Sequence, residues 1–269
     1  MAVTFPELGR AGRLGNQLFQ IASTVGIARE LGTKPLFPEW DYAPIFSLPK
    51  DFFEKSPGPE VEATNYAIRL DERERIYLQD VSLFDHIKGE IKAIFSPSEM
   101  ALDILSSDIE TIRSLAHPIL SLHVRRGDIL THPEYHPVRS VEYYERALTQ
   151  IEFASVVIFS DDLDWCRRIL APRLGLDVSF YGSEVTRSPV PDQYAIDGPV
   201  DWQDLFLMQE CDSHIISNST YAWWGAYLSE DAHPIYPSNW FGRMLSHAQP
   251  ELLFPGNWIQ VMDETQGGV

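Results

Sequence analysis

The clearest hydrophobic pattern lies in the second half of the chain, where short apolar runs alternate with amphipathic segments. We predict buried strands at residues 119–124, 155–160, 178–181, 214–217 and 235–236. Helices are predicted between them, over residues 140–150, 164–174, 201–211 and 220–228. Because the strands are apolar on both faces and alternate with helices, they predict an α/β domain with a helix-covered parallel sheet, as in a Rossmann-like fold.

The first half has a less regular pattern. A glycine-rich turn at residues 9–15 precedes apolar positions at helical spacing over residues 18–28, and Gly32 is expected to end that helix. A short strand is predicted at residues 34–38, followed by a proline-rich irregular excursion to about residue 60. Residues 67–78 and 85–95 carry no decisive pattern. We expect a domain boundary at Pro118, which divides the chain into domains 1–117 and 118–269.

Composition adds a strong charge asymmetry to this picture. The 269 residues include 21 Lys and Arg against 39 Asp and Glu, for a formal net charge of −18. So acidic a surface argues against nucleic acid and anionic membranes as general partners. A phosphorylated ligand would need a positively charged pocket within this field. We therefore expect the acidic excess on outer faces and a positive patch at the ligand site.

Cysteine usage and hydropathy indicate a reduced, water-soluble protein. Cys166 and Cys211 are the only cysteines, which excludes a cysteine-rich zinc site and a secreted disulfide framework. The N-terminus lacks a basic segment followed by an apolar run, and no stretch approaches about 18 consecutive apolar residues. We expect a cytoplasmic protein without a transmembrane segment, with a peripheral position at the inner face of the membrane as an alternative.

Ligands of parallel α/β sheets bind at the carboxyl ends of the strands. The strand predicted at residues 119–124 ends in His123 and Val124 and is followed by Arg125, Arg126, Gly127 and Asp128. The guanidinium fork fits two phosphate oxygens, and a glycine allows backbone amides to approach an anion. The alternative is a solvated arginine pair neutralised by nearby acids.

The strand predicted at residues 214–217 runs into Ser217, Asn218, Ser219 and Thr220 before the next helix. Hydroxyl groups, an amide and a helix N-terminus together suit phosphate binding, although simple helix capping accounts for the same residues. The adjacent tryptophans of that helix cannot both face one core, so Trp224 is a candidate to line a pocket, with aromatic core as the alternative.

Two further segments carry polar groups at turns. Asp161 and Asp162 follow the strand at residues 155–160, where acids suit a base, a ribose or the N-terminus of a helix. Asp162 and Asp164, separated by Leu163, match the short DxD pattern of metal-dependent glycosyltransferases. Asn16 and Gln17 open the first helix after a glycine turn that is neither GxGxxG nor a P-loop, so NAD and ATP are not supported as ligands.

Taken in order, these segments resemble the α-1,2-fucosyltransferases, glycosyltransferase family 11. The resemblance is carried by GRLGNQLFQ at residues 12–20, HVRRGD at 123–128, FSDD at 159–162 and the block at 205–228 that contains SNSTYAWWGA. It implies a GT-B-like fold of two facing Rossmann-type domains, with the nucleotide sugar bound by the C-terminal one and the acceptor on the side of residues 1–117.

The resemblance also implies the reaction. Fucose would pass with inversion from GDP-β-L-fucose to the 2-hydroxyl of a terminal β-galactoside on an oligosaccharide or glycolipid, without a divalent metal or other cofactor. Arg125 would be the main donor-phosphate ligand and Arg126 the supporting one. By the same likeness, Asp161 and Asp162 would lie near guanine or ribose, and Asn16 and Gln17 would face the donor phosphate or fucose.

The general base stays open at this point. His123, Asp128, Asp161, Glu39 and Asp41 are the candidates, and a weak base or none could suffice. Three alternatives to the main hypothesis also remain. These are a metal-dependent transferase that uses the DxD acids, a nucleotide-sugar-binding protein without transferase activity, and a fucosyltransferase with another linkage or acceptor.

Overall fold

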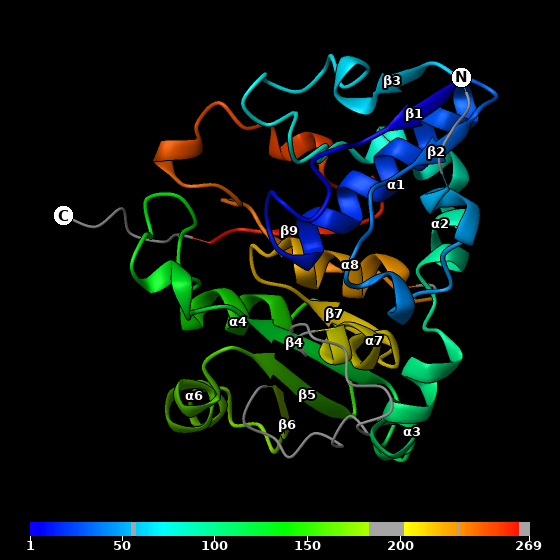
Figure 1. Cartoon of the computed structure of the whole chain (residues 1–269). Coiled ribbons are helices and arrows are strands. Elements are labelled where there is room, and N and C mark those ends of the chain that lie inside the picture. Colours follow the sequence, from blue (N-terminus) through cyan, green and yellow to red (C-terminus); the bar gives the residue numbers. More distant parts are fainter. Residues whose placement is uncertain (55–57, 183–201, 231, 264–269) are drawn as a thin grey trace. The chain divides into compact units, whose positions relative to one another are not determined.

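The computed structural model describes residues 1–54, 58–182, 202–230 and 232–263, with the side chains of residues 179–182 left aside. The chain forms two compact units (Figure 1). Among the described residues, the first unit holds Met1–Ile104 and His247–Pro255, and the second holds residues 105–182, 202–246 and 256–263. The division falls within a helix ahead of Pro118. The functional division into domains 1–117 and 118–269 stays a prediction.

The first unit is built on a short parallel sheet with the order β2-β1-β3. The strands are β1 (Ala2–Thr4), β2 (Lys34–Leu36) and β3 (Glu60–Glu62), and helix α1 (Leu14–Glu30) connects the first two. Almost every residue of α1 is buried, which is why its sequence is apolar with few charges. Helix α2 (Lys88–Ile94) follows, and α3 (Glu99–Arg113) continues into the second unit.

The second unit contains a parallel sheet with the order β6-β5-β4-β7-β8-β9. Its strands are β4 (Ile119–Val124), β5 (Ser155–Ser160), β6 (Ser179–Gly182), β7 (Ser213–Ile215), β8 (Ile235–Pro237) and β9 (Ile259–Val261). Successive strands run outward from β4 on one side and from β7 on the other. The strand order therefore reverses between β4 and β7, and the carboxyl edge at such a point is where α/β sheets bind ligands.

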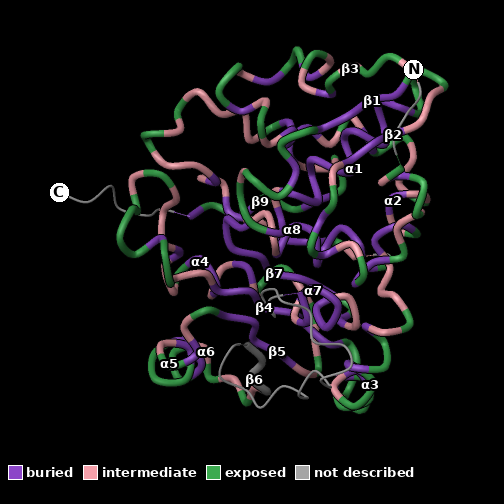
Figure 2. Tube along the Cα trace, in the orientation of Figure 1, coloured by how far each residue is buried: buried purple, intermediate pink, exposed green. Residues whose placement is uncertain are grey.

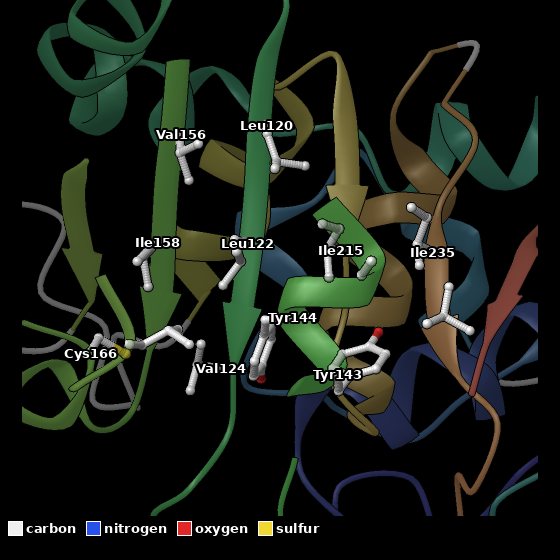
Figure 3. Close-up of a cluster of buried hydrophobic side chains, with 13 residues drawn as sticks. Leu120, Leu122, Val124, Tyr143, Tyr144, Val156, Ile158, Cys166, Ile215 and Ile235 are labelled. Atoms are coloured by element: carbon white, nitrogen blue, oxygen red, sulfur yellow. The ribbon is translucent and has the colours of Figure 1, made fainter. Parts of the chain in front are cut away.

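Helices cover this sheet as the alternating sequence pattern predicts. They are α4 (Val141–Leu148), α5 (Leu163–Trp165), a π-helical segment (Cys166–Leu170), α6 (Ala171–Leu174), α7 (Trp202–Gln209) and α8 (Thr220–Leu228). Leu120, Leu122 and Val124 of β4 pack with Val156 and Ile158 of β5 in the hydrophobic core. Figure 3 shows these side chains with the tyrosines of α4, and Figure 2 shows the central strands as buried. This packing holds the strand ends in fixed register.

Most predicted elements of the second unit are confirmed within one or two residues, and the strands at 119–124 and 155–160 match in full. Asp201, the predicted start of one helix, lies outside the described residues. In the first unit, residues 67–78 contain turns, and residues 85–95 form a 3-10 turn followed by α2. The sequence analysis missed strands β1, β3 and β9 and helix α3. No helix in the described part of the chain combines the length and apolarity needed to span a membrane.

Candidate functional site

Three neighbouring strands of the second unit bring the predicted strand-end segments together. Strands β5, β4 and β7 lie side by side and parallel, so their carboxyl ends share one edge of the sheet. Residues 125–128, here called the arginine loop, follow β4. Residues 217–220, the serine loop, follow β7 and include Thr220, the first residue of α8. Asp161 and Asp162 follow β5. The sheet thus assembles most of the predicted site residues at its switch point.

Arg125 is held by both loops. Its Nε and Nη2 donate to the two carboxylate oxygens of Asp128 at 3.2 and 2.9 Å, and its Nη1 donates to the backbone oxygen of Asn218 at 3.3 Å. The side chain is 17% exposed, whereas that of Asp128 is 51% exposed. The guanidinium is thus held in place, and a phosphate that binds there could replace the exposed Asp128 carboxylate as its partner.

Arg126 is fixed by contacts on three sides. Its guanidinium lies over the ring of Trp165 at 4.1 Å, and its Nε donates to Asp162 at 3.0 Å. Its backbone N–H donates to Asp161 at 2.7 Å. A Cβ at Gly127 would lie 2.8 Å from the same Asp161 carboxylate, so glycine permits this close approach.

The two aspartates therefore position the arginine loop. Asp162 also accepts from the backbone N–H of Trp165 at 3.1 Å, which caps helix α5. Their contacts with guanine or ribose stay a prediction.

His123 joins the two loops from inside the fold. Its Nδ1 lies 2.9 Å from the Ser217 hydroxyl, and its backbone oxygen accepts from the Tyr144 hydroxyl at 3.2 Å. Burial, with a smaller effect of the nearby Arg125 charge, lowers the pKa of His123 to about 3. The imidazole is therefore neutral at physiological pH, and so low a pKa makes it a weak proton acceptor.

The serine loop is buried and internally organised. Ser217, Asn218 and Ser219 are 0%, 1% and 6% exposed. The Asn218 amide donates to the backbone oxygens of Pro137 at 3.1 Å and Trp240 at 3.2 Å. Ser219 is the N-cap residue of α8, but its side chain makes no capping hydrogen bond. The loop is thus more than a helix cap, because its amide side chain ties it to two other segments of the unit.

Trp224 requires a correction. We predicted it as a ligand-binding residue, but its side chain is 0% exposed. It packs edge-to-face on Trp223 with ring centroids 4.9 Å apart, and Trp223 stacks on Tyr227 at 4.7 Å. Helix α8 is buried on nearly all sides, so adjacent tryptophans can both enter the core. Aromatic core, the alternative interpretation, is what the structure shows.

Asn16 and Gln17 belong to the first unit, whereas the other predicted site residues belong to the second. The Gln17 amide donates to the Gly12 backbone oxygen at 3.0 Å and accepts from the Trp40 indole at 2.7 Å, so it stabilises the glycine turn. Asn16 is partly exposed and accepts from Gln79 at 2.9 Å. Gly12 has φ +74°, and a Cβ there would lie 2.3 Å from the Asn16 amide, which explains the glycine.

The acids of the DxD pattern are both engaged by arginines. Asp162 pairs with Arg126 at 3.0 Å, and Asp164 pairs with Arg168 at 2.9 Å. Across the described residues, no group of three or more His, Cys, Asp or Glu side chains is arranged to hold a metal ion. A metal at this pattern would have to displace two ion pairs.

Sequence reasoning missed a second layer behind the loops. Arg139 and Asp263 form an ion pair at 2.7 Å with side chains only 1% and 0% exposed. Arg139 directly precedes the helix predicted at residues 140–150, so the sequence indicates where it lies along the chain. Nothing in the sequence near Asp263 indicates that it is the partner of Arg139. Pairing between residues so distant in sequence depends on the sheet order, which the pattern of elements does not specify.

Comparison with known proteins shows the family of the chain. A model of glycosyl transferase family 11 matches residues 29–261. The chain belongs to this family. The match covers the arginine and serine loops but begins after residues 12–20, which carried part of the resemblance.

Curated relatives include the Escherichia coli O-antigen biosynthesis glycosyltransferase WbnK, 33% identical over 61% of this chain and 54% of that protein. An Escherichia coli alpha-1,2-colitosyltransferase is 29% identical over 69% of this chain and 61% of that protein. Mus musculus galactoside alpha-(1,2)-fucosyltransferase 2 is 26% identical, with 93% of this chain and 76% of that protein covered. This chain thus spans little more than half the length of the two bacterial relatives.

Solved structures support the fold. A mutant of Arabidopsis thaliana FUT1 in complex with GDP matches 87% of this chain and 70% of that one, with a TM-score of 0.54 and 13% identity. POFUT1 in complex with GDP matches 87% of this chain and 96% of that one, with a TM-score of 0.51 and 12% identity. The predicted fold class, α/β and GT-B-like with Rossmann-type parallel sheets, is confirmed.

Proposed function

We propose that the chain is a glycosyltransferase that moves L-fucose from GDP-β-L-fucose to the 2-hydroxyl of a terminal β-galactoside, with inversion. The observation that carries the proposal is the pair of anchored arginines beside the serine loop, at the switch point of the parallel sheet. Family membership and the names of curated relatives support the class of reaction. We place the reaction in the cytoplasm, with GDP-fucose and an oligosaccharide or glycolipid as partners.

In such a reaction negative charge accumulates on the departing GDP. Arg125 is the group best placed to bind it, because its guanidinium spans the arginine and serine loops. The N-terminus of α8 directs its positive dipole end toward the same edge of the sheet. Fixed donors of this kind stabilise developing charge without reorganisation, and removal of one such donor lowers the rate by about 100-fold or more.

The exposure and the contacts of the candidate side chains reduce the choice of proton acceptor. His123 is buried with a pKa of about 3, and Asp161 already accepts a backbone N–H within the unit. Asp128, the carboxylate of the arginine loop, is 51% exposed, but it also holds Arg125. Glu39 and Asp41 are exposed residues of the first unit. We propose Asp128 as the first candidate within the second unit.

We further propose that no divalent metal takes part, since Arg125 and Arg126 supply the positive charge at the donor site. The contacts of Asp162 and Asp164 with arginines support this. A second candidate donor deserves a direct test, because one relative at 29% identity is named a colitosyltransferase. Colitose transfer would keep the same phosphate site and differ only in the pocket for the sugar.

The test is incubation of the chain with GDP-fucose and a panel of β-galactosides, followed by linkage analysis, with and without EDTA. We expect an α-1,2-linked fucose and EDTA-resistant activity. Arg125→Ala should retain less than about a tenth of the rate, while Arg168→Ala, which removes an exposed arginine, should keep it. Failure of the wild-type chain to transfer fucose, or survival of activity in Arg125→Ala, would overturn the proposal. Activity restored only by manganese would assign a metal-dependent reaction.

A further inference from the structure

A buried ion pair lies behind the two loops of the second unit. Arg139 directly precedes helix α4 and Asp263 follows strand β9, and the Arg139 Nη1 lies 2.7 Å from an Asp263 carboxylate oxygen. The side chains are 1% and 0% exposed. The same Arg139 nitrogen also donates to the side-chain oxygen of Asn239. The guanidinium is thus fully enclosed by its partners.

Burial of this pair opposes its charges. It raises the pKa of Asp263 and lowers the pKa of Arg139, and in each case this effect exceeds that of the partner's charge. A buried ion pair is therefore weak evidence for stability, and apolar residues of similar volume often serve stability as well. What distinguishes this pair is its position in the hydrogen-bond network.

One branch of that network leads to Arg125. The Pro137 backbone oxygen accepts from Arg139 twice, from Nε at 3.1 Å and Nη2 at 2.7 Å. The same oxygen accepts from the Asn218 amide at 3.1 Å. The Asn218 backbone oxygen in turn accepts from Arg125 at 3.3 Å. The ion pair therefore fixes the carbonyl that positions the serine loop, and this loop holds the first arginine.

A second branch runs through helix α4. The other carboxylate oxygen of the pair accepts from the Ser140 hydroxyl at 3.3 Å, and Ser140 caps the helix by accepting from the Tyr143 N–H at 3.2 Å. The Tyr143 hydroxyl donates to the Ile216 backbone oxygen at 2.6 Å. The Tyr144 hydroxyl donates to the backbone oxygen of His123 at 3.2 Å. The capped helix therefore holds Ile216, directly before the serine loop, and His123, two residues before the arginine loop.

We propose that Arg139 and Asp263 are positioning residues for donor binding, which lock the arginine and serine loops in one geometry before the nucleotide arrives. The claim that the bound molecule is a nucleoside diphosphate rests on the proposed function. The claim that the pair orders the loops does not.

The experiment compares Asp263→Asn with Val156→Ala in the full chain. Val156 lies on β5 in the core, 3% exposed, so its truncation destabilises the unit and removes no hydrogen bond of the network. Hydrogen exchange is followed in the ligand-free proteins. GDP affinity is measured by calorimetry well below both melting temperatures. If Asp263→Asn does not fold, the double variant Arg139→Met with Asp263→Leu replaces it, because it removes both buried charges together.

We expect Asp263→Asn, or the double variant in its place, to lose at least tenfold protection at residues 125–128 and 217–220, and to bind GDP at least tenfold more weakly. In Val156→Ala the protection of both loops and the GDP affinity should stay within twofold of wild type. Unchanged exchange in the loops would overturn the positioning role, and so would wild-type GDP affinity in a folded variant. If the wild-type chain itself does not bind GDP, the proposed function fails, while the exchange data still decide whether the pair orders the loops.

Discussion

His214 offers a test of the fold that is independent of any ligand. It lies on β7, is 0% exposed, and within the described part of the chain neither ring nitrogen has a hydrogen-bond partner. Burial lowers its pKa to about 3, against a small opposing effect of Asp212. The perturbation is His214→Leu, which keeps a similar volume and removes two desolvated polar atoms. We expect the variant to be at least as stable as wild type at pH 7.5.

The effect of His214 on stability can be worked out from its pH dependence. Because the folded-state pKa of about 3 lies below the unfolded-state value of about 6.5, the unfolded chain binds the proton first as pH falls. The stability contribution is complete above pH 6.5 and is lost progressively toward pH 3. Between pH 7.5 and 5.5, each histidine with this shift lowers the free energy of unfolding by about 1.4 kcal/mol. His123 shares this shift, so the pair lowers wild-type stability by about 3 kcal/mol over this interval.

Urea unfolding at pH 7.5, 6.5 and 5.5 measures this loss directly. His214→Leu should lose about half as much free energy of unfolding as wild type between the two end points. His233→Asn is the control, because it removes a histidine that is exposed rather than buried and so shows what the loss of a histidine alone does to the slope. Equal slopes for wild type and His214→Leu would show that the histidine is protonated inside the fold, and the account of its burial would be wrong.

Other predictions concern glycines and the arginine loop. Gly242→Ala should destabilise the fold by about 1–3 kcal/mol, because the new Cβ would meet the backbone oxygen of Glu134 at 2.3 Å. Gly89→Ala in helix α2, where a Cβ meets nothing within 4 Å, should stabilise the fold by about 0.4–1 kcal/mol. Thermal denaturation should therefore show a lower melting temperature for Gly242→Ala and a higher one for Gly89→Ala. Asp128→Asn should tighten GDP binding by up to about fivefold in calorimetry, since it weakens the competitor for Arg125. Loss of transfer in the same variant would support Asp128 as the proton acceptor, whatever the change in GDP affinity.

The fold of the second unit was predictable because its strands are buried on both faces. Runs such as Ile119–Val124 are mostly apolar and are buried along their whole length. The helices between them begin at clear signals such as Ser140, which caps α4. Strand β9 was not predicted because it is only partly buried, with Ile259 exposed. The first unit was less predictable, since its strands are only three residues long and much of its polar network consists of side chains bonded to turns.

The candidate site was predictable to the extent that it depends on strand ends. A strand end places Arg125 and Ser217 at one edge whatever the sheet order. Which neighbour each side chain contacts depends on that order, so the bond from Arg125 to the Asn218 carbonyl could not be foreseen. Trp224 was misassigned for a related reason, since a local pattern cannot show that α8 is enclosed on nearly all sides.

The net charge of −18 led us to expect a positive patch at the ligand site. The structure gives a more specific arrangement, because Arg125 and Arg126 are each paired with an aspartate. These pairs keep the guanidinium groups in place within a strongly acidic chain, where unpaired arginines would find other acids. A phosphate that binds here therefore exchanges one anion for another and adds little net charge to the site. Its selectivity must come from the bidentate geometry of guanidinium groups held in advance, which is why the residues that position them matter as much as the arginines themselves.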